Sequence, residues 1–133
     1  MSDQTSILAA LETLVEARLG AGIVVPEPQT LEDLKPPVAV LYALDYERIA
    51  LDFKQDLITY PFALFVKQKS NEDVPATRNA LYDDFELIRT DLKADVTLSG
   101  VVRDSRITGM LVTSAAEGAF VHGVLNIDAV VLR

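Results

Sequence analysis

The C-terminal segment of the chain alternates between two kinds of position. In the stretch AFVHGVLNIDAVVLR, every second residue from Val121 to Val131 is apolar or small. A period of two is typical of a β-strand that rests one side on a hydrophobic core. The other positions of the segment carry both polar and apolar side chains. These positions are Phe120, His122, Val124, Asn126, Asp128, Val130 and Leu132. The pattern therefore predicts a strand whose second, partly apolar face needs a cover.

Two other segments show helical spacing. Apolar residues recur every three or four positions from Ile7 to Leu19, with Ser and Thr upstream as candidate caps and Gly20 as a stop. The stretch SNEDVPATRNALYDDFELIRTDLKAD places Pro75 early in a second helix. The apolar stripe of this second helix consists of Leu81, Phe85, Ile88 and Leu92.

Strand patterns fill much of the remaining chain. Residues 38–45 and the stretch TYPFALFVKQ both alternate, which predicts two antiparallel neighbouring strands. A short extended piece is expected around residues 23–25, before a proline-rich loop at residues 26–37. In a further strand, one set of alternating positions is Ile107, Gly109, Leu111 and Thr113. With AAEG as a turn, this strand predicts a hairpin with the C-terminal strand.

The segment DYERIALDFKQDLI, between the first two of these strands, alternates only in part. Either the strands extend into a long hairpin that turns near residues 54–56, or the segment is an exposed arm. On a monomer, Ile49, Leu51 and Phe53 of such an arm would form an exposed apolar edge, which proteins in water normally avoid.

The order of these elements predicts the fold class. An α-β-β-α-β-β chain forms an α+β two-layer sandwich, with an antiparallel or mixed sheet of about four to five strands and two main helices on one face. The chain has 133 residues, 50% of them hydrophobic, which suits a single domain over residues 1–133.

Composition narrows the classes of partner. The chain has 12 Lys and Arg against 20 Asp and Glu, a formal net charge of −8, whereas binding to nucleic-acid phosphates needs clustered cations. An acidic surface would instead let DNA slide past without binding. Cysteine is absent, which excludes disulfides and thiolate metal sites. The apolar runs are too short for a membrane span and MSDQTS lacks the basic start of a signal peptide, so no membrane partner is expected.

Candidate catalytic groups are few. His122 is the only imidazole, so a histidine metal cluster or a nucleophile–base pair has little to build on. On a strand face with Asn126 and Asp128, His122 is expected to be a hydrogen-bonded interface or surface residue. Most carboxylates of the second helix lie away from its apolar stripe, which is typical of a helix face in water. These carboxylates are Asp83, Asp84, Glu86 and Asp91. No enzyme activity, cofactor or metal site is predicted.

Two covers fit the second face of the C-terminal strand. The second helix or the loop at residues 26–37 folds across it, or a neighbouring subunit does. Obligate interfaces resemble a hydrophobic core cut in half and mix apolar with hydrogen-bonding groups. Val124, Asn126, Val130 and Leu132 offer such a mixture.

Six stretches in sequence carry a family resemblance: SILAALETLVEARLG, LEDLKPPVAVLYALD, YPFALFVKQ, ALYDDFELIRTDL, RITGMLVTSAAEG and GVLNIDAVVLR. Over nearly the full chain, this series resembles the tail terminator proteins of long-tailed phages and of related contractile tails. The resemblance implies a structural virion protein, assembled in the host cytoplasm, that forms a hexameric ring on the tail tube. Such a ring stops tube polymerisation because its far face offers the tube protein no further docking site, and it presents that face to the neck or connector. DNA would pass through its lumen without specific binding.

The resemblance also suggests where subunits meet, namely at the segment around residues 49–53 and on the mixed face of the last strand. The expected interface residues are Ile49, Leu51, Phe53, Phe120, His122, Val124, Asn126, Val130 and Leu132. Two alternatives remain open. One is a head–tail joining or other tail adaptor protein, and the other is a small ligand-binding α+β domain with a pocket lined by Tyr42, Phe62 and Phe65.

Overall fold

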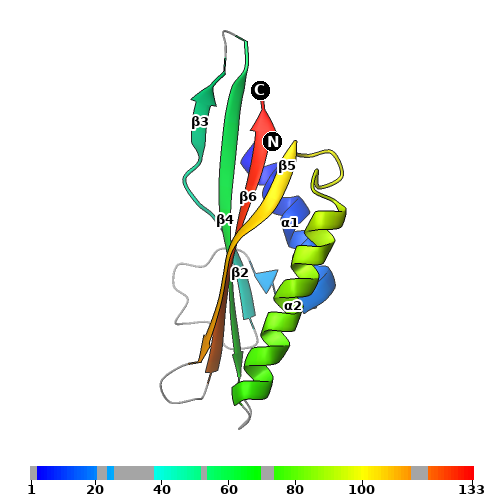
Figure 1. The fold of residues 1–133 in the computed structure, drawn as a ribbon, viewed down its shortest axis with the longest axis vertical. Helices are drawn as coiled ribbons and strands as arrows, with labels where there is room; N and C mark the ends of the chain where they lie inside the picture. The colour runs from blue at the N-terminus through cyan, green and yellow to red at the C-terminus, as the bar shows by residue number, and fades with distance from the viewer. Residues whose placement is uncertain (1–2, 21–23, 26–37, 52–53, 70–73, 115–119) are drawn as a thin grey trace.

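The computed structural model describes residues 3–20, 24–25, 38–51, 54–69, 74–114 and 120–133. Two helices and six strands follow one another along the chain (Figure 1). They are α1 (Asp3–Leu19), β1 (Val24–Val25), β2 (Val38–Ala43), β3 (Glu47–Ala50), β4 (Asp56–Lys69), α2 (Val74–Ala94), β5 (Asp104–Ser114) and β6 (Phe120–Leu132).

The predicted class, α+β with two helices and an antiparallel or mixed sheet, is confirmed, since all strand pairs but one are antiparallel in the described residues. The element order differs from the prediction by two additional strands, β1 and β3. β1 lies where the sequence indicated an extended piece, and it pairs in parallel with β2. β3 comes from the partly alternating segment, which folds back on β4 as a long hairpin, one of the two predicted alternatives, with Ala50 opposite Asp56.

The sheet is built around two long central strands. Its strand order is β1-β2-β4-β6-β5, and β3 pairs with the far end of β4. β4 and β6 are antiparallel from the pair Leu57 and Leu132 to the pair Lys69 and Phe120. The predicted pairing of β2 with β4 and the predicted hairpin of β5 with β6 are both present. Because β4 and β6 are far apart in sequence, their pairing could not be read from local patterns.

One side of the sheet faces the hydrophobic core, and Figure 1 shows both helices on that side. The predicted stripe of α2 is buried throughout, as are Ile7, Leu11, Val15 and Leu19 of α1. In β6, Gly123 lets α2 approach closely, because a Cβ atom there would lie 2.7 Å from Phe85 and 2.8 Å from Leu81. Alternate residues of β4 complete this core, and they are Ile58, Tyr60, Phe62, Leu64 and Val66.

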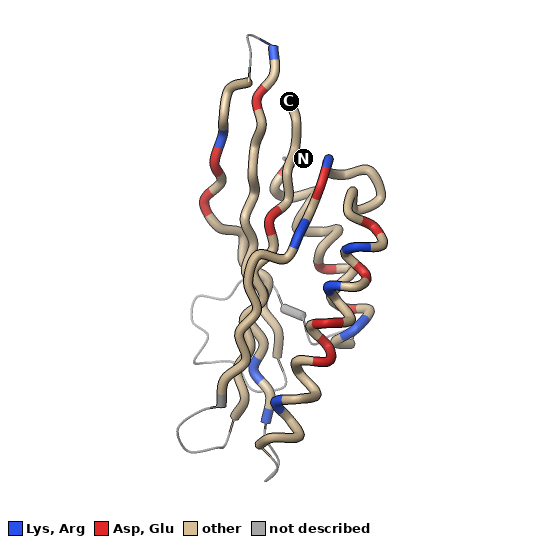
Figure 2. The backbone as a smooth tube through the Cα atoms, viewed as in Figure 1, with Lys and Arg blue, Asp and Glu red and all other residues tan. Residues whose placement is uncertain are grey.

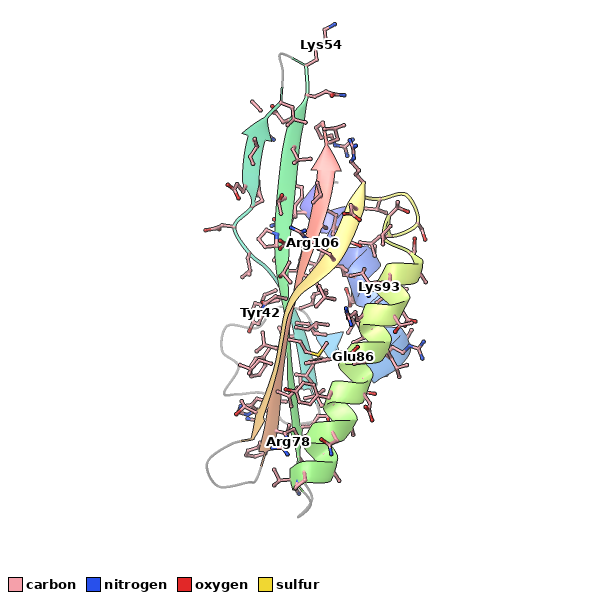
Figure 3. The ribbon with its side chains drawn as sticks, in the orientation of Figure 1. Tyr42, Lys54, Arg78, Glu86, Lys93 and Arg106 are labelled. Atoms are coloured by element: carbon pink, nitrogen blue, oxygen red, sulfur yellow. The ribbon has the colours of Figure 1, made fainter. Side chains whose placement is uncertain are left out.

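The hairpin of β3 and β4 projects beyond the ends of the helices (Figure 1). We call β3 together with residues 56–60 of β4 the arm. At its tip, the backbone N–H of Leu51 donates to the carbonyl oxygen of Gln55 at 2.9 Å, and Lys54 marks this tip in Figure 3. Pro61 lies where β4 passes from β3 to β2, and its carbonyl oxygen accepts a hydrogen bond from Leu44. The arm is therefore a continuation of the main sheet rather than a separate loop.

Polar contacts hold the helices to each other and to the end of the sheet. Arg18 near the end of α1 donates to both carboxylate oxygens of Asp91 on α2, at 2.6 and 2.8 Å. Gly20, with φ of 107°, ends α1 as predicted, and its N–H donates to Glu16. Arg133 pairs with Asp3, which joins the end of β6 to the start of α1.

β5 contains one extra residue relative to its partner. Ile107 pairs with Ile127 but Gly109 pairs with Asn126, so Thr108 forms a bulge. Side chains on the two sides of the bulge therefore follow opposite phases of alternation. The sequence grouping of Ile107 with Leu111 on one face is wrong for this reason, since Ile107 packs against the core and Leu111 is 60% exposed.

Candidate functional site

The side of the sheet away from the core is the candidate site, and we call it the open face. None of the described helix residues belongs to this face, because both helices bury their stripes on the other side. Its β4 and β6 residues are half-buried, with Lys69 and Asn126 exposed, whereas the alternate residues on the core side are buried from Ile58 to Val66 of β4 and from Val121 to Val131 of β6. The second helix is thus excluded as its cover, and the loop at residues 26–37 lies outside the described residues.

At one end of the open face, an apolar row crosses four strands and begins on β2 with Val40, which pairs with Phe65 and is fully buried. Phe65 on β4 pairs with Val124 on β6, which pairs with Leu111 on β5. Phe65 and Val124 are half-buried and Leu111 is 60% exposed. We call these three residues the lower patch. Figure 2 draws the neighbouring parts of β5 and β6 without charged residues.

His122 lies beside the lower patch in a different setting from the one expected. Its ring lies 5.6 Å from that of Phe65, and it pairs across the strands with Lys67 and Thr113. Its Nε2 atom is buried and has no hydrogen-bond partner among the described residues, so the expected hydrogen bonding is not observed at this atom. Burial and then the charge of Lys67 lower the pKa of His122 below its usual 6.5. The imidazole is therefore neutral at neutral pH.

The lower patch is bordered by a cation. The ammonium of Lys67 lies 4.6 Å from the centre of the Phe120 ring, a cation–π contact. Lys67 forms no ion pair with any carboxylate in the described part of the chain. One edge of the lower patch therefore carries a positive charge without an ionic partner among these residues.

At the other end of the open face, a second apolar row crosses the arm. Ile49 on β3 pairs with Leu57 on β4, which pairs with Leu132 on β6. We call these three residues the arm patch. Ile49 is 50% exposed, and Leu51 beside the tip is 55% exposed. The row next to the arm patch contains Glu47, Thr59, Val130 and Asp104.

A polar belt separates the two patches. It consists of the cross-strand pair Arg106 and Asp128 together with the exposed amide of Asn126. Tyr42 of β2 lies near the middle of the sheet, on the side away from the helices (Figure 3). The open face thus has an apolar row at each end and a hydrophilic centre.

The structure brings most of the predicted interface residues onto this one face. The β6 residues Phe120, His122, Val124, Asn126, Val130 and Leu132 all lie on it, and Ile49 joins them through Leu57. Leu51 lies beside the arm tip, and Phe53 lies outside the described residues. The sequence did not indicate Leu57, whose place depends on the pairing of three strands, or Leu111, whose exposure depends on the bulge.

The predicted ligand pocket is wrong. Phe62 is fully buried on the core side, whereas Phe65, three positions along the same strand, lies on the open face with Tyr42. An odd step along a strand places side chains on opposite faces. These three residues therefore do not line a common cavity.

Within the described ranges, no three His, Cys, Asp or Glu side chains come together in a group that could hold a metal ion. Neither described helix is long and apolar enough to cross a bilayer. These findings leave the open face as the surface feature that most needs explanation.

Comparison with known proteins gives no family assignment. No protein-family model matches the chain, and no curated protein matches it significantly. The function is therefore argued from the chain's own surface. A sheet face with exposed aliphatic side chains at both ends is suited to contact with another protein, because contact removes these side chains from water.

Proposed function

We propose that this chain is a structural subunit of a phage tail, a terminator that forms a homo-oligomeric ring at the end of the tail tube. The open face is the observation that carries this proposal. Its two apolar patches lie on the same side of one sheet, with Ile49 and Leu111 50% and 60% exposed. Covering such surface gains about 25 cal/mol per Å² of apolar area, so a partner that covers both patches would bind favourably.

A ring explains why both patches are present on every subunit. Subunits that join through two different surfaces continue head to tail, and they form a closed ring when the rotation between neighbours closes, as in a hexamer. Each copy then covers one patch of each of two neighbours. The closed ring ends tube growth because its outer face differs from the docking surface of the tube protein, and that outer face receives the neck or connector.

The charge of the chain suits this location. A net charge of −8 per subunit gives a ring with a strongly acidic surface, which repels a DNA duplex in the lumen and lets it pass. The proposed role is structural and not catalytic, and it needs no cofactor. Its partners are other copies of the chain, the tail tube protein and the neck or connector.

Mass measurement and microscopy test the proposal. We expect light scattering after size exclusion to show an oligomer larger than a dimer, and electron microscopy to show rings on the ends of added tail tubes. Monomers at every concentration together with bare tube ends would contradict it. Pull-down separates the terminator from a head–tail joining protein, since a terminator retains tube protein and a joining protein retains the connector alone.

A further inference from the structure

We infer that the arm patch of one copy docks on the lower patch of the next copy. The occupant of each patch is thus an unlike patch of a second copy of this chain. The inference rests on the proposed function, because it names the two surfaces that join ring subunits. It depends on the position, width and charge of the two patches on the open face.

The two patches of one chain cannot cover each other. Leu57 and Phe65 lie on the same strand and the same face, and eight strand positions at about 3.3 Å each separate them by about 26 Å. β4 and β6 pair continuously between the two rows, so the sheet has no hinge that would fold one patch onto the other. When one patch is covered by the other, the covering patch must therefore belong to another molecule.

The patches match in width and chemistry. Each presents three apolar side chains that are not fully buried, on β3, β4 and β6 in the arm patch and on β4, β6 and β5 in the lower patch. The lower row also continues onto β2 with Val40, but this side chain is fully buried. Sheets that pack face to face approach to about 10 Å with their side chains interdigitated. The exposed Ile49 and Leu111 side chains are the ones best placed to interdigitate in such a contact.

Charge favours the pairing of unlike patches. Next to the arm patch, Glu47 and Asp104 are exposed carboxylates without an ion pair in the described part of the chain. Next to the lower patch, Lys67 is a cation that also has no such ion pair. Pairing arm with arm would bring carboxylates together, whereas pairing arm with lower patch brings them toward Lys67.

A charge exchange tests the pairing. Ile49→Glu puts an acid in the arm patch, and Leu111→Lys puts a base in the lower patch. Each substitution alone is expected to weaken self-association about tenfold or more, because a charge is then buried against an apolar row. The double variant is expected to assemble again, since the introduced glutamate of each copy then meets the introduced lysine of a neighbour.

Mixing the two single variants gives a second readout. An equimolar mixture should assemble with alternating subunits, because one kind of contact joins glutamate to lysine and the other joins two unchanged patches. Leu87→Glu, at an exposed leucine of α2 away from the open face, is the matched control and should assemble like the parent chain. Circular dichroism of each variant checks that the fold is retained.

The outcomes separate the inference from the proposed function. Assembly of either single variant at parental strength, or failure of both the double variant and the mixture to recover, overturns the pairing of unlike patches while leaving the ring intact. A parent chain that stays monomeric and leaves tube ends bare overturns the ring, and the inference with it. Recovery in the double variant and in the mixture supports the inference.

Discussion

Adjacent residues of β6 serve opposite sides of the molecule. His122 and Val124 lie on the open face, while Gly123 between them lies under α2. The alternation predicted which residues share a face. It did not predict that Gly123 meets Phe85 and Leu81, because this contact depends on where α2 crosses the sheet. A period in the sequence identifies the faces of a strand, whereas the packing partners depend on tertiary structure.

Gly123 gives a prediction at this scale. A Cβ atom in Gly123→Ala would lie 2.7 Å from the Phe85 ring, so α2 or the ring must shift. Overpacking of this kind costs typically about 1–3 kcal/mol of unfolding free energy. Urea unfolding at low protein concentration measures the loss. Val124→Ala, on the opposite face, is the control and should lose less, and equal stability of Gly123→Ala and the parent chain would show that α2 adjusts freely.

At the scale of elements, local signals predicted the helices better than the sheet. Apolar spacing is contained within one segment, and both helices follow it. The Ser and Thr expected to cap the first helix instead lie inside α1, which begins at Asp3. The strands were found, but their order was not, because the pairing of β4 with β6 joins distant segments. The bulge at Thr108 was missed because a strict period of two has no sign of an extra residue. The candidate site was therefore predicted on β6 and in part on β3, but not on β4 or β5.

The ion pair between α1 and α2 gives the second prediction. The hydrogen bonds from Arg18 lower the pKa of Asp91 below 3.8. This pair therefore contributes stability above that pH, and the contribution is lost as the pH falls through the lowered pKa. Asp91→Asn should reduce the melting temperature at pH 7, and by less at about 1 M salt, where screening weakens the pair in the parent chain.

Thermal melts at two salt concentrations measure this effect. The matched control is Glu86→Gln, which removes the exposed pair of Glu86 with Arg89 within α2. Because exposed pairs within one helix contribute little, this control should melt close to the parent chain. A loss in Glu86→Gln equal to that in Asp91→Asn would mean that the contact between the helices has no special role.

At the scale of the whole molecule, one side of the sheet forms the core with both helices, and neither described helix packs on the other side. The core side carries both helices, and the open face carries the two patches and the belt between them (Figure 1). Composition alone indicated a single acidic domain, but it could not show that exposed apolar side chains gather on one face of the sheet. This placement follows from the pairing of all the strands together.

Association predicts that stability depends on concentration. A native state that assembles is favoured by mass action, so a tenfold rise in protein concentration should raise the melting temperature of the parent chain by about 3 °C or more. Leu111→Lys should show a smaller rise across that range, because its self-association is weaker. Calorimetry at several concentrations measures both, and a parent chain without concentration dependence would argue against assembly through the open face.

The bulge at Thr108 has a consequence for changes in chain length. Ser105 and Ile107 before it belong to the interior, while Leu111 beyond it points to the outside. Removing Thr108 would restore simple alternation from Ile107 to Gly109 and would leave Leu111 on the open face, opposite Val124. The bulge is thus the place in β5 where one residue can be lost without exchanging inner and outer surfaces, whereas a deletion farther along the strand would exchange them for every residue that follows.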